Sequence, residues 1–316
     1  MKVRSVCVIG GSGFLGRHVV HRLAAQEIFV RVPTRRRERA KELILLPTVD
    51  VFNADVHDPR ILERLVAPVD AVINLVGILH EAHGETFERN HVELPRKIVG
   101  ACRETGVKRL VHVSALKAAF DAPSAYLRSK AEGESQVHAA QAVGIHTTIL
   151  RPSVIFGRED SFLNLFARLA RLLPVIALAS PNARFQPIFV EDVARALTEC
   201  LTDPHTFGNS YDLCGPKVYS LRELVEYVCR TLGVQRPIIG LSESLSLLQA
   251  ALLERLPGRL MTRDNVYSMR TDNVCGCAFP ELLGFSPTPL EAVVPEYLAG
   301  VTPRTRYRWF RYRARR

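Results

Sequence analysis

The first half of the chain alternates short apolar runs with longer amphipathic segments. Residues 6–9 and 71–76 are apolar on both faces of the expected strands, as a sheet covered by helices on both sides requires. Strands that alternate with helical segments indicate a doubly wound, parallel α/β sheet. Strands are expected at 3–10, 28–32, 49–53, 70–77, 109–115 and 145–150, and helices at 14–26, 36–46, 59–66, 85–106 and 125–141.

The pattern changes after residues 151–157. Helical segments then dominate, extended pieces are short, and the loops contain more proline. Residues 184–215 again have the pattern of a strand followed by a helix, so we expect the chain to return there to its first domain. The prediction is a first domain over 1–155 with a return at about 184–215, a smaller, mainly helical C-terminal domain over 156–183 and 216–302, and a basic tail over 303–316.

Positive charge is concentrated at the end of the sequence. The 316 residues have a formal net charge of +10, and residues 303–316 contain seven arginines and no acidic residue. Such a tail can simply keep a chain soluble. Arginines that alternate with aromatic residues also suit an anionic membrane surface or an acidic partner. Nucleic acid is the least favoured partner.

Two observations bear on location. No apolar run approaches the roughly 20 residues of a membrane span, and no targeting segment precedes the first expected strand. We therefore expect a cytoplasmic protein of bacterial type, with a peripheral position at the inner face of a membrane as an option. The broad apolar face of residues 244–256 suits a core or an interface, or else a helix that faces a membrane.

The first candidate site is a glycine-rich turn between the first strand and the first helix. Gly10, Gly13 and Gly16 have the spacing of a dinucleotide-binding fingerprint, in which glycines permit a tight turn and a close approach of the backbone to a pyrophosphate. The start of the helix then offers free N–H groups to the phosphates. We expect the same loop to contribute Ser12, Phe14 and Leu15.

The end of the second strand bears on the choice of cofactor. NAD-selective sites place an acidic residue there, whereas this sequence has Thr34 followed by arginines at positions 35–37. Arginine side chains suit a 2′-phosphate, so Thr34, Arg35 and Arg36 favour NADP(H) over NAD(H). The alternative is that these arginines begin a solvated helix face.

Two further strand ends lie where ligands bind in such sheets. Asp55, followed by Val56, comes after the third strand and suits either hydrogen bonding to an adenine or the capping of a turn. The fourth strand closes with Leu75, Val76 and Gly77, at the carboxyl edge of the sheet.

A serine, a tyrosine and a lysine are the candidate catalytic residues. Ser114 ends the fifth expected strand, and Tyr126 and Lys130 follow on one face of a helix. A lysine beside a phenol favours the phenolate and lowers its pKa, which suits acid–base chemistry near neutrality. The pair His80 and His83 has a spacing that metals use, but no third ligand is apparent, so we expect no metal.

Together these motifs resemble the extended and atypical short-chain dehydrogenases/reductases. The stretches NLVGIL, SAYLRSKAEGE, RPSVIFGREDSFLN, ARFQPIFVEDVARAL and LMTRDNV further resemble the branch that includes accessory subunit nine of the alpha subcomplex of respiratory complex I and its bacterial epimerase/dehydratase-like relatives. The resemblance implies a Rossmann fold, Tyr126 as acid/base, Lys130 on the nicotinamide ribose and Ser114 on the substrate. It also implies cofactor contacts at Asn90, Pro152 and Val154.

Two functions follow from this resemblance. One is an NADP(H)-dependent oxidoreductase or epimerase that acts on a small, lipophilic or quinone-like substrate, because the three catalytic positions are all filled. The other is a cofactor-loaded, non-catalytic accessory subunit of a respiratory, complex I-like or quinone-related membrane assembly. Its contacts would come from the C-terminal region and the basic tail.

Overall fold

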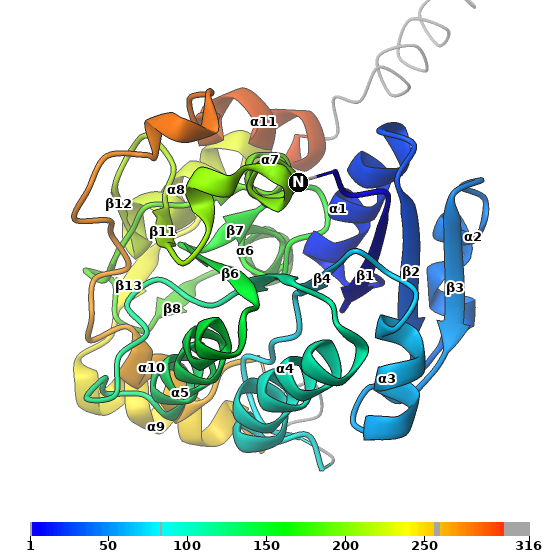
Figure 1. The fold of residues 1–316 in the computed structure, drawn as a ribbon. Coiled ribbons are helices and arrows are strands. Elements are labelled where there is room, and N and C mark those ends of the chain that lie inside the picture. Colours follow the sequence, from blue (N-terminus) through cyan, green and yellow to red (C-terminus); the bar gives the residue numbers. More distant parts are fainter. Residues whose placement is uncertain (1, 83, 256–259, 300–316) are drawn as a thin grey trace, which may run out of the picture. The chain divides into compact units, whose positions relative to one another are not determined.

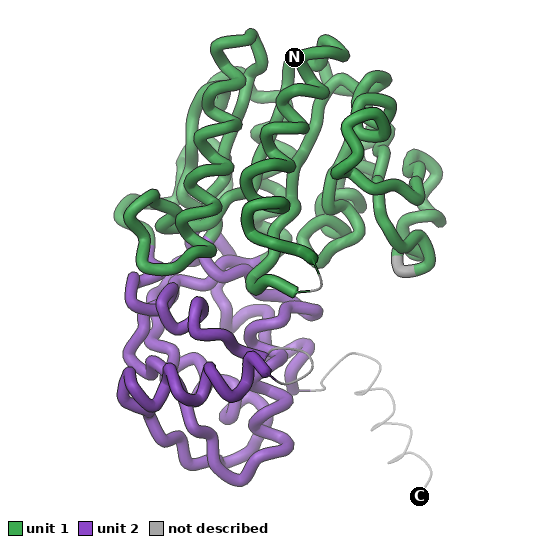
Figure 2. Tube along the Cα trace, turned by 90° about the horizontal axis from the view of Figure 1, so that it is seen from below, with its two compact units in different colours: residues 1–152, 190–213, 275–285 green, residues 153–189, 214–274, 286–316 purple. Residues whose placement is uncertain are grey.

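The fold was obtained as a computed structural model, which describes residues 2–82, 84–255 and 260–299. The basic tail and His83 lie outside these described residues. The chain forms two compact units, which Figure 2 shows in green and purple. Unit 1 comprises residues 1–152, 190–213 and 275–285, and unit 2 comprises residues 153–189, 214–274 and 286–316.

Unit 1 is built on a seven-stranded sheet in the order β11-β6-β5-β4-β1-β2-β3, and each neighbouring pair is parallel. The predicted doubly wound parallel sheet is thereby confirmed. The order reverses between β1 and β4, and ligands of such sheets bind at that reversal, outside the carboxyl ends of the strands. The strands are β1 (Ser5–Ile9), β2 (Phe29–Thr34), β3 (Val49–Asn53), β4 (Ala71–Asn74), β5 (Arg109–Val113), β6 (His146–Pro152) and β11 (Ser210–Leu213).

Helices cover both faces of this sheet (Figure 1). On one face, α3, α4 and α5 pack side by side, and on the other α1 packs against α7. Helix α1 buries Gly16, Val19, Val20 and Leu23, which share one helix face because their spacing follows the helical repeat. The helices are α1 (Phe14–Ala25), α2 (Lys41–Ile44), α3 (Pro59–Val66), α4 (Leu94–Thr105), α5 (Ala125–Ala139) and α7 (Val190–Thr202).

Short helical turns complete unit 1. The π-helical turn η2 precedes α4 without a break, in a stretch where the sequence predicted one continuous helix. The residues of this turn approach the candidate site. The turns are η1 (Arg37–Ala40), η2 (Glu88–Glu93), η3 (Ala140–Val143), η4 (Pro204–Thr206) and η5 (Glu281–Leu283).

Unit 2 packs helices and three two-stranded sheets around its own core. Phe156, Phe166, Phe185, Leu224 and Val294 are buried in this core. Among the residues that the structure describes, no helix is long and apolar enough to cross a membrane. The elements are β7 (Ile155–Phe156), α6 (Leu163–Leu172), β8 (Ile176–Leu178), β9 (Arg184–Phe185), β10 (Ile188–Phe189), β12 (Tyr219–Ser220), α8 (Leu221–Leu232), β13 (Ile238–Gly240), α9 (Glu243–Leu253), α10 (Arg263–Ser268) and α11 (Leu290–Leu298).

Candidate functional site

The glycine-rich turn forms a tight connection between β1 and α1. Gly10 has a φ of +85°, a conformation that side chains rarely adopt. A Cβ atom on Gly16 would lie 2.3 Å from the carbonyl oxygen of Gly10, so only glycine fits there. The N-cap Gly13 has no side chain to bond the first turn of α1. The backbone amides at the start of α1 are therefore available to an anion.

Other loop residues connect this turn to its neighbours. Ser12 Oγ donates to Thr34 Oγ1 at 3.1 Å, which ties the glycine turn to the end of β2. Arg36 N donates to the same Thr34 hydroxyl at 3.3 Å. Phe14 lies edge-to-face on His18, with 5.7 Å between ring centroids, and Leu15 is half-buried.

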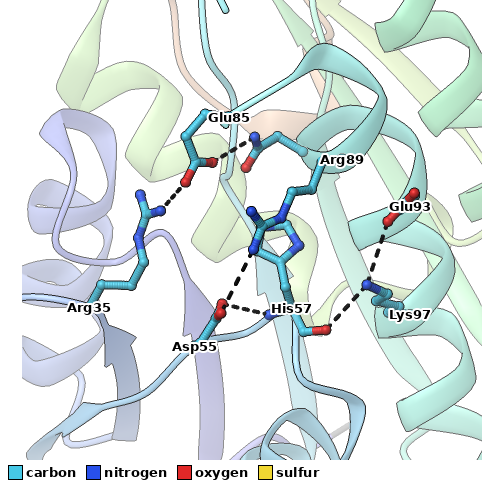
Figure 3. A network of polar contacts seen from close by, with 8 residues as sticks. Arg35, Asp55, His57, Glu85, Arg89, Glu93 and Lys97 are labelled. Atoms are coloured by element: carbon cyan, nitrogen blue, oxygen red, sulfur yellow. Dashed lines mark hydrogen bonds and ion pairs between the residues drawn. The ribbon is translucent and has the colours of Figure 1, made fainter. Parts of the chain in front are cut away.

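The arginines after β2 have an acidic neighbour that the sequence did not indicate. Arg35 forms an ion pair with Glu85 (Figure 3). The second carboxylate oxygen of Glu85 accepts a hydrogen bond of 2.8 Å from Nδ2 of the buried Asn90. Nothing in the sequence could identify Glu85, because it lies 50 positions after Arg35 in a loop.

Asp55, at the end of β3, belongs to the same polar cluster (Figure 3). It accepts a hydrogen bond from His57 N at 3.0 Å, and Arg89 on η2 lies 3.8 Å from its carboxylate. Lys97 on α4 donates to the carbonyl oxygen of His57 at 3.2 Å. The turn-forming role and the ligand-facing role considered for Asp55 are thus compatible, since the carboxylate stays exposed. Val56 packs against the core of the sheet.

The end of β4 meets the start of the glycine turn. A Cβ atom on Gly10 would lie 3.2 Å from Leu75 C and from Val76 N, so the two loops are in close contact. Asn74 Oδ1 accepts a hydrogen bond from Val76 N at 3.1 Å. Gly77 is exposed, and a Cβ atom there would lie 3.7 Å from Lys130 Nζ. The strand ends at the sheet reversal are therefore assembled as a ligand site requires.

His91 holds this loop to helix α5. Its Nε2 accepts a hydrogen bond of 3.0 Å from Ile78 N, and its Nδ1 lies 2.8 Å from Ser129 Oγ. Since Nε2 accepts, Nδ1 carries the proton of a neutral ring. Burial, with Lys130 nearby, lowers the His91 pKa to about 2. The sequence did not predict that His91 would connect this loop to α5, because a histidine in an amphipathic segment has no distinguishing pattern.

Aromatic rings surround Tyr126. His91 and Phe87 both lie edge-to-face with its ring, with centroids at 5.6 Å and 6.0 Å. Ser129 Oγ donates to the carbonyl oxygen of Tyr126 at 2.8 Å. The Tyr126 ring is thus packed against Phe87 and against His91 of η2.

Lys130 and the small cluster that Tyr126 packs against both involve residues next to Ser114 in the sequence. Lys130 Nζ donates to the carbonyl oxygen of Val113 at 2.9 Å, and Tyr126 packs against the small cluster that contains Ala115. The structure therefore brings Lys130 to the strand end that precedes Ser114, with Tyr126 one helical turn before it on α5. Ser114 Oγ is buried and, in the part of the chain that the structure describes, has no hydrogen-bond partner. A buried hydroxyl without a partner is costly, and a hydrogen bond to a ligand is one way to satisfy it.

The protonation states differ from the simple expectation that the lysine lowers the tyrosine pKa. Burial raises the pKa of Tyr126 to about 12. Burial also lowers the pKa of Lys130 to about 8, against an opposing effect of Glu134. Desolvation acts on both groups here, and the Lys130 ammonium is directed at a backbone carbonyl. At neutral pH the pair is a neutral phenol beside an ammonium.

Pro152 and Val154 fall in different units. Pro152 ends β6, and its carbonyl oxygen accepts a hydrogen bond from Leu116 N at 3.0 Å, next to Ser114 in unit 1. Val154 belongs to unit 2, where its amide donates to Asn273 Oδ1 at 3.2 Å. Pro152 therefore has a defined place beside the catalytic residues.

The residues of unit 1 fit a dinucleotide. Any side chain in place of the glycines would fill the space at the glycine turn, and the start of α1 presents free backbone amides. Ser114 supplies a buried hydroxyl without a hydrogen-bond partner. No group of three His, Cys, Asp or Glu side chains among the described residues is arranged to hold a metal ion. The geometry thus supports nucleotide binding beside a tyrosine–lysine pair.

The comparison with protein families agrees with this geometry. Residues 6–214 match the NAD dependent epimerase/dehydratase family. The chain belongs to that family. It is 34% identical over 315 residues to the mitochondrial NADH dehydrogenase [ubiquinone] 1 alpha subcomplex subunit 9 of Mus musculus, which covers 96% of this chain and 81% of that protein. It is 30% identical over 250 residues to a ceramide reductase of Caulobacter vibrioides, covering 79% and 77%.

Solved structures with low sequence identity to this chain share its fold. A UDP-glucuronic acid 4-epimerase from Bacillus cereus, solved with UDP-glucuronic acid and NAD, has a TM-score of 0.70 at 18% identity, covering 94% of this chain and 99% of that one. An NADPH-dependent quinone oxidoreductase of Escherichia coli, solved with NADPH, has a TM-score of 0.71 at 20% identity, covering 93% and 97%. The chain is therefore a member of an epimerase- and reductase-like family whose structural neighbours include both NAD and NADPH complexes.

Proposed function

We propose that this protein is an NADP(H)-dependent oxidoreductase that reduces the carbonyl group of a small lipophilic or quinone-like substrate. The observation that carries the proposal is the buried, unpartnered Ser114 hydroxyl directly after Val113, whose carbonyl oxygen accepts a hydrogen bond from Lys130. The relative named ceramide reductase supports a lipophilic substrate. The arginines that follow β2 support NADP(H) over NAD(H).

Each residue has one task in this reaction. Bound NADPH would supply the hydride. Tyr126 is a neutral phenol at pH 7, since its pKa is raised to about 12, and donates its proton to the substrate oxygen. Ser114 donates a hydrogen bond to the same oxygen, which satisfies its own buried hydroxyl. Lys130, largely protonated at pH 7, stabilises the phenolate that remains.

The experiment that tests this function separates binding from turnover. The purified protein is offered NADPH and NADH with a panel of lipophilic ketones and quinones, and cofactor binding is measured by fluorescence. Tyr126→Phe is expected to retain NADPH binding and to reduce turnover at least about 100-fold, since general acid catalysis contributes on that order. Equal turnover by the wild type and the variant would contradict the proposed role of Tyr126.

A second function rests on the surface of α9. Leu245, Leu248 and Leu252 follow one helix face and are 51%, 58% and 57% exposed, while Ser246 and Ala250 on the other face are buried. Adjacent exposed leucines are typical of interaction surfaces. Because relatives bear the names of complex I subunits, we propose that the alternative to catalysis is an accessory role in a respiratory or quinone-related membrane assembly. Either role places the protein in the cytoplasm or peripherally at the inner face of the membrane.

A further inference from the structure

The Arg35–Glu85 ion pair is not used by the proposed reaction. Glu85 ends a short turn in which Ala82 and Glu85 exchange two backbone hydrogen bonds, of 3.1 Å and 2.9 Å. Its carboxylate lies opposite Arg35, directly after β2 (Figure 3). The structure thus brings an acidic residue to the strand end where the sequence contains only arginines.

Several contacts hold Glu85 in this position. The side chain of Asn90, which is 3% exposed, donates at 2.8 Å to Glu85 and at 3.1 Å to the carbonyl oxygen of Thr86. Although partial burial raises the pKa of Glu85, the hydrogen bonds from Asn90 and Arg35 lower it below its ordinary value. The carboxylate therefore stays ionised and directed at Arg35 throughout the neutral range.

The neighbouring arginines show which positive charges remain available. Arg89 is paired with Asp55 at 3.8 Å. Within the described ranges, Arg36 and Arg37 are exposed and form no ion pair. Arg36 is thus free to meet an incoming phosphate, whereas Arg35 must first leave Glu85.

An arginine near the end of β2 accommodates the 2′-phosphate in NADP(H)-binding sheets of this type. We propose that Glu85 sets the cofactor preference by competing with the 2′-phosphate of NADP(H) for the guanidinium of Arg35. This inference rests on the proposed use of NADP(H). A phosphate carries more charge and more acceptor oxygens than a carboxylate, so it displaces Glu85 at a cost in affinity. A ribose 2′-hydroxyl does not displace Glu85, so NAD(H) binds with the pair intact.

The experiment measures binding of two nucleotides that differ by one group. Adenosine 2′,5′-bisphosphate and adenosine 5′-monophosphate are titrated by calorimetry into the wild type and into Glu85→Gln. The glutamine retains an oxygen for Asn90 but removes the charge that holds Arg35. We expect affinity for the bisphosphate to rise about threefold to fivefold and affinity for the monophosphate to change less than twofold, since an exposed ion pair contributes up to this order.

Matched variants separate local competition from a general change of charge. Glu88→Gln removes an equal charge from the exposed side chain of Glu88 on η2, which forms no ion pair in the described part of the chain. It is expected to leave both affinities unchanged. The double variant Arg35→Ala/Glu85→Gln is expected not to show the increase in affinity for the bisphosphate. Thermal unfolding of every variant shows that the fold is retained.

The outcomes distinguish this inference from the proposed function. If Glu85→Gln leaves the preference for the bisphosphate unchanged while Arg35→Ala abolishes it, Arg35 binds the phosphate and Glu85 does not compete. That result overturns the inference alone. If the wild type and all variants bind both nucleotides equally, the 2′-phosphate has no site, and the proposed use of NADP(H) fails with it.

Discussion

Lys130 shows how the surroundings of a residue decide its chemistry. A lysine four positions after a tyrosine suggests only that a cation lies near a phenol. The structure adds that both groups are buried, so the pKa of Lys130 falls to about 8 while that of Tyr126 rises to about 12. Desolvation could not be inferred from the spacing, because it depends on which elements pack over α5. In the proposed reaction, the phenol would therefore act first as an acid.

The lowered pKa of Lys130 predicts a dependence of stability on pH. Its pKa is about 10.5 in the unfolded chain and about 8 in the folded one, so between these values the unfolded chain binds more protons. The free energy of unfolding therefore rises with pH across this window. Relative to Lys130→Gln, the wild type is expected to gain about 2–3 kcal/mol between pH 7 and pH 10, as followed by urea unfolding. A constant difference between the two proteins across these pH values would show that Lys130 is not desolvated.

Residues of the site differ in how far the sequence reveals them. Gly10, Gly16 and Ser114 follow from the fingerprint and from the strand that ends before Ser114. The structure places Gly10 and Ser114 directly after β1 and β5, and Gly16 in the first turn of α1. Glu85 and His91 come from a loop and from η2, and their contacts with Arg35 and Ser129 are made 50 and 38 positions away in the chain. A pattern with a period of two or 3.6 residues carries no information about such distant pairs.

At the scale of elements, the crossing of α5 and η2 brings Tyr126 against His91. Gly133 permits this crossing, because a Cβ atom there would lie 2.0 Å from the carbonyl oxygen of His91. The hydrophobic pattern predicted both segments as helical but did not predict the π-helical turn. Its wider backbone ring arises from packing against α5 and α4, which a local pattern does not describe.

Two glycine variants test the importance of this crossing. Gly133→Ala is expected to lower the free energy of unfolding by about 1–3 kcal/mol, since the added methyl group must push η2 away from α5. Gly100→Ala on α4 is the matched control, because nothing lies within 4 Å of its Cβ position. That substitution is expected to stabilise the protein by about 0.5–1 kcal/mol, as alanine does in a helix interior. Chemical unfolding of both variants provides the comparison, and equal effects would indicate that the crossing is loosely packed.

At the scale of the whole molecule, the parallel sheet was predictable because its strands from β1 to β6 alternate with recognisable helices. The seventh strand, β11, lies in the segment 184–215, where the chain was expected to return to its first domain. The way in which the later part of the chain is divided between the two units was less predictable. Unit 1 includes residues 275–285, which contain only the short turn η5 and have no periodic apolar pattern. Unit 2 uses strands of two or three residues, which are too short to produce alternation.

Charge and exposed apolar surface together predict how the molecule meets a membrane. Residues 303–316 carry seven of the ten net positive charges, and α9 exposes Leu248 and Leu252. Arginines near an anionic bilayer contribute on the order of 1 kcal/mol each, and exposed leucines add apolar burial. In co-sedimentation with vesicles, deletion of 303–316 is expected to reduce binding to anionic lipid more than tenfold.

The leucine face requires its own variant and a control. Leu248→Gln/Leu252→Gln is expected to weaken binding to anionic vesicles without lowering stability, because both side chains are already exposed. Leu45→Gln alters a leucine in unit 1 that is 82% exposed and lies far from α9 in the sequence, so it is expected to leave binding unchanged. If the full-length and truncated chains bind anionic and neutral vesicles equally, neither the charge nor α9 directs the protein to a membrane. The exposed leucines would then be expected to contact a protein partner. Binding of that partner should be insensitive to lipid charge and to salt.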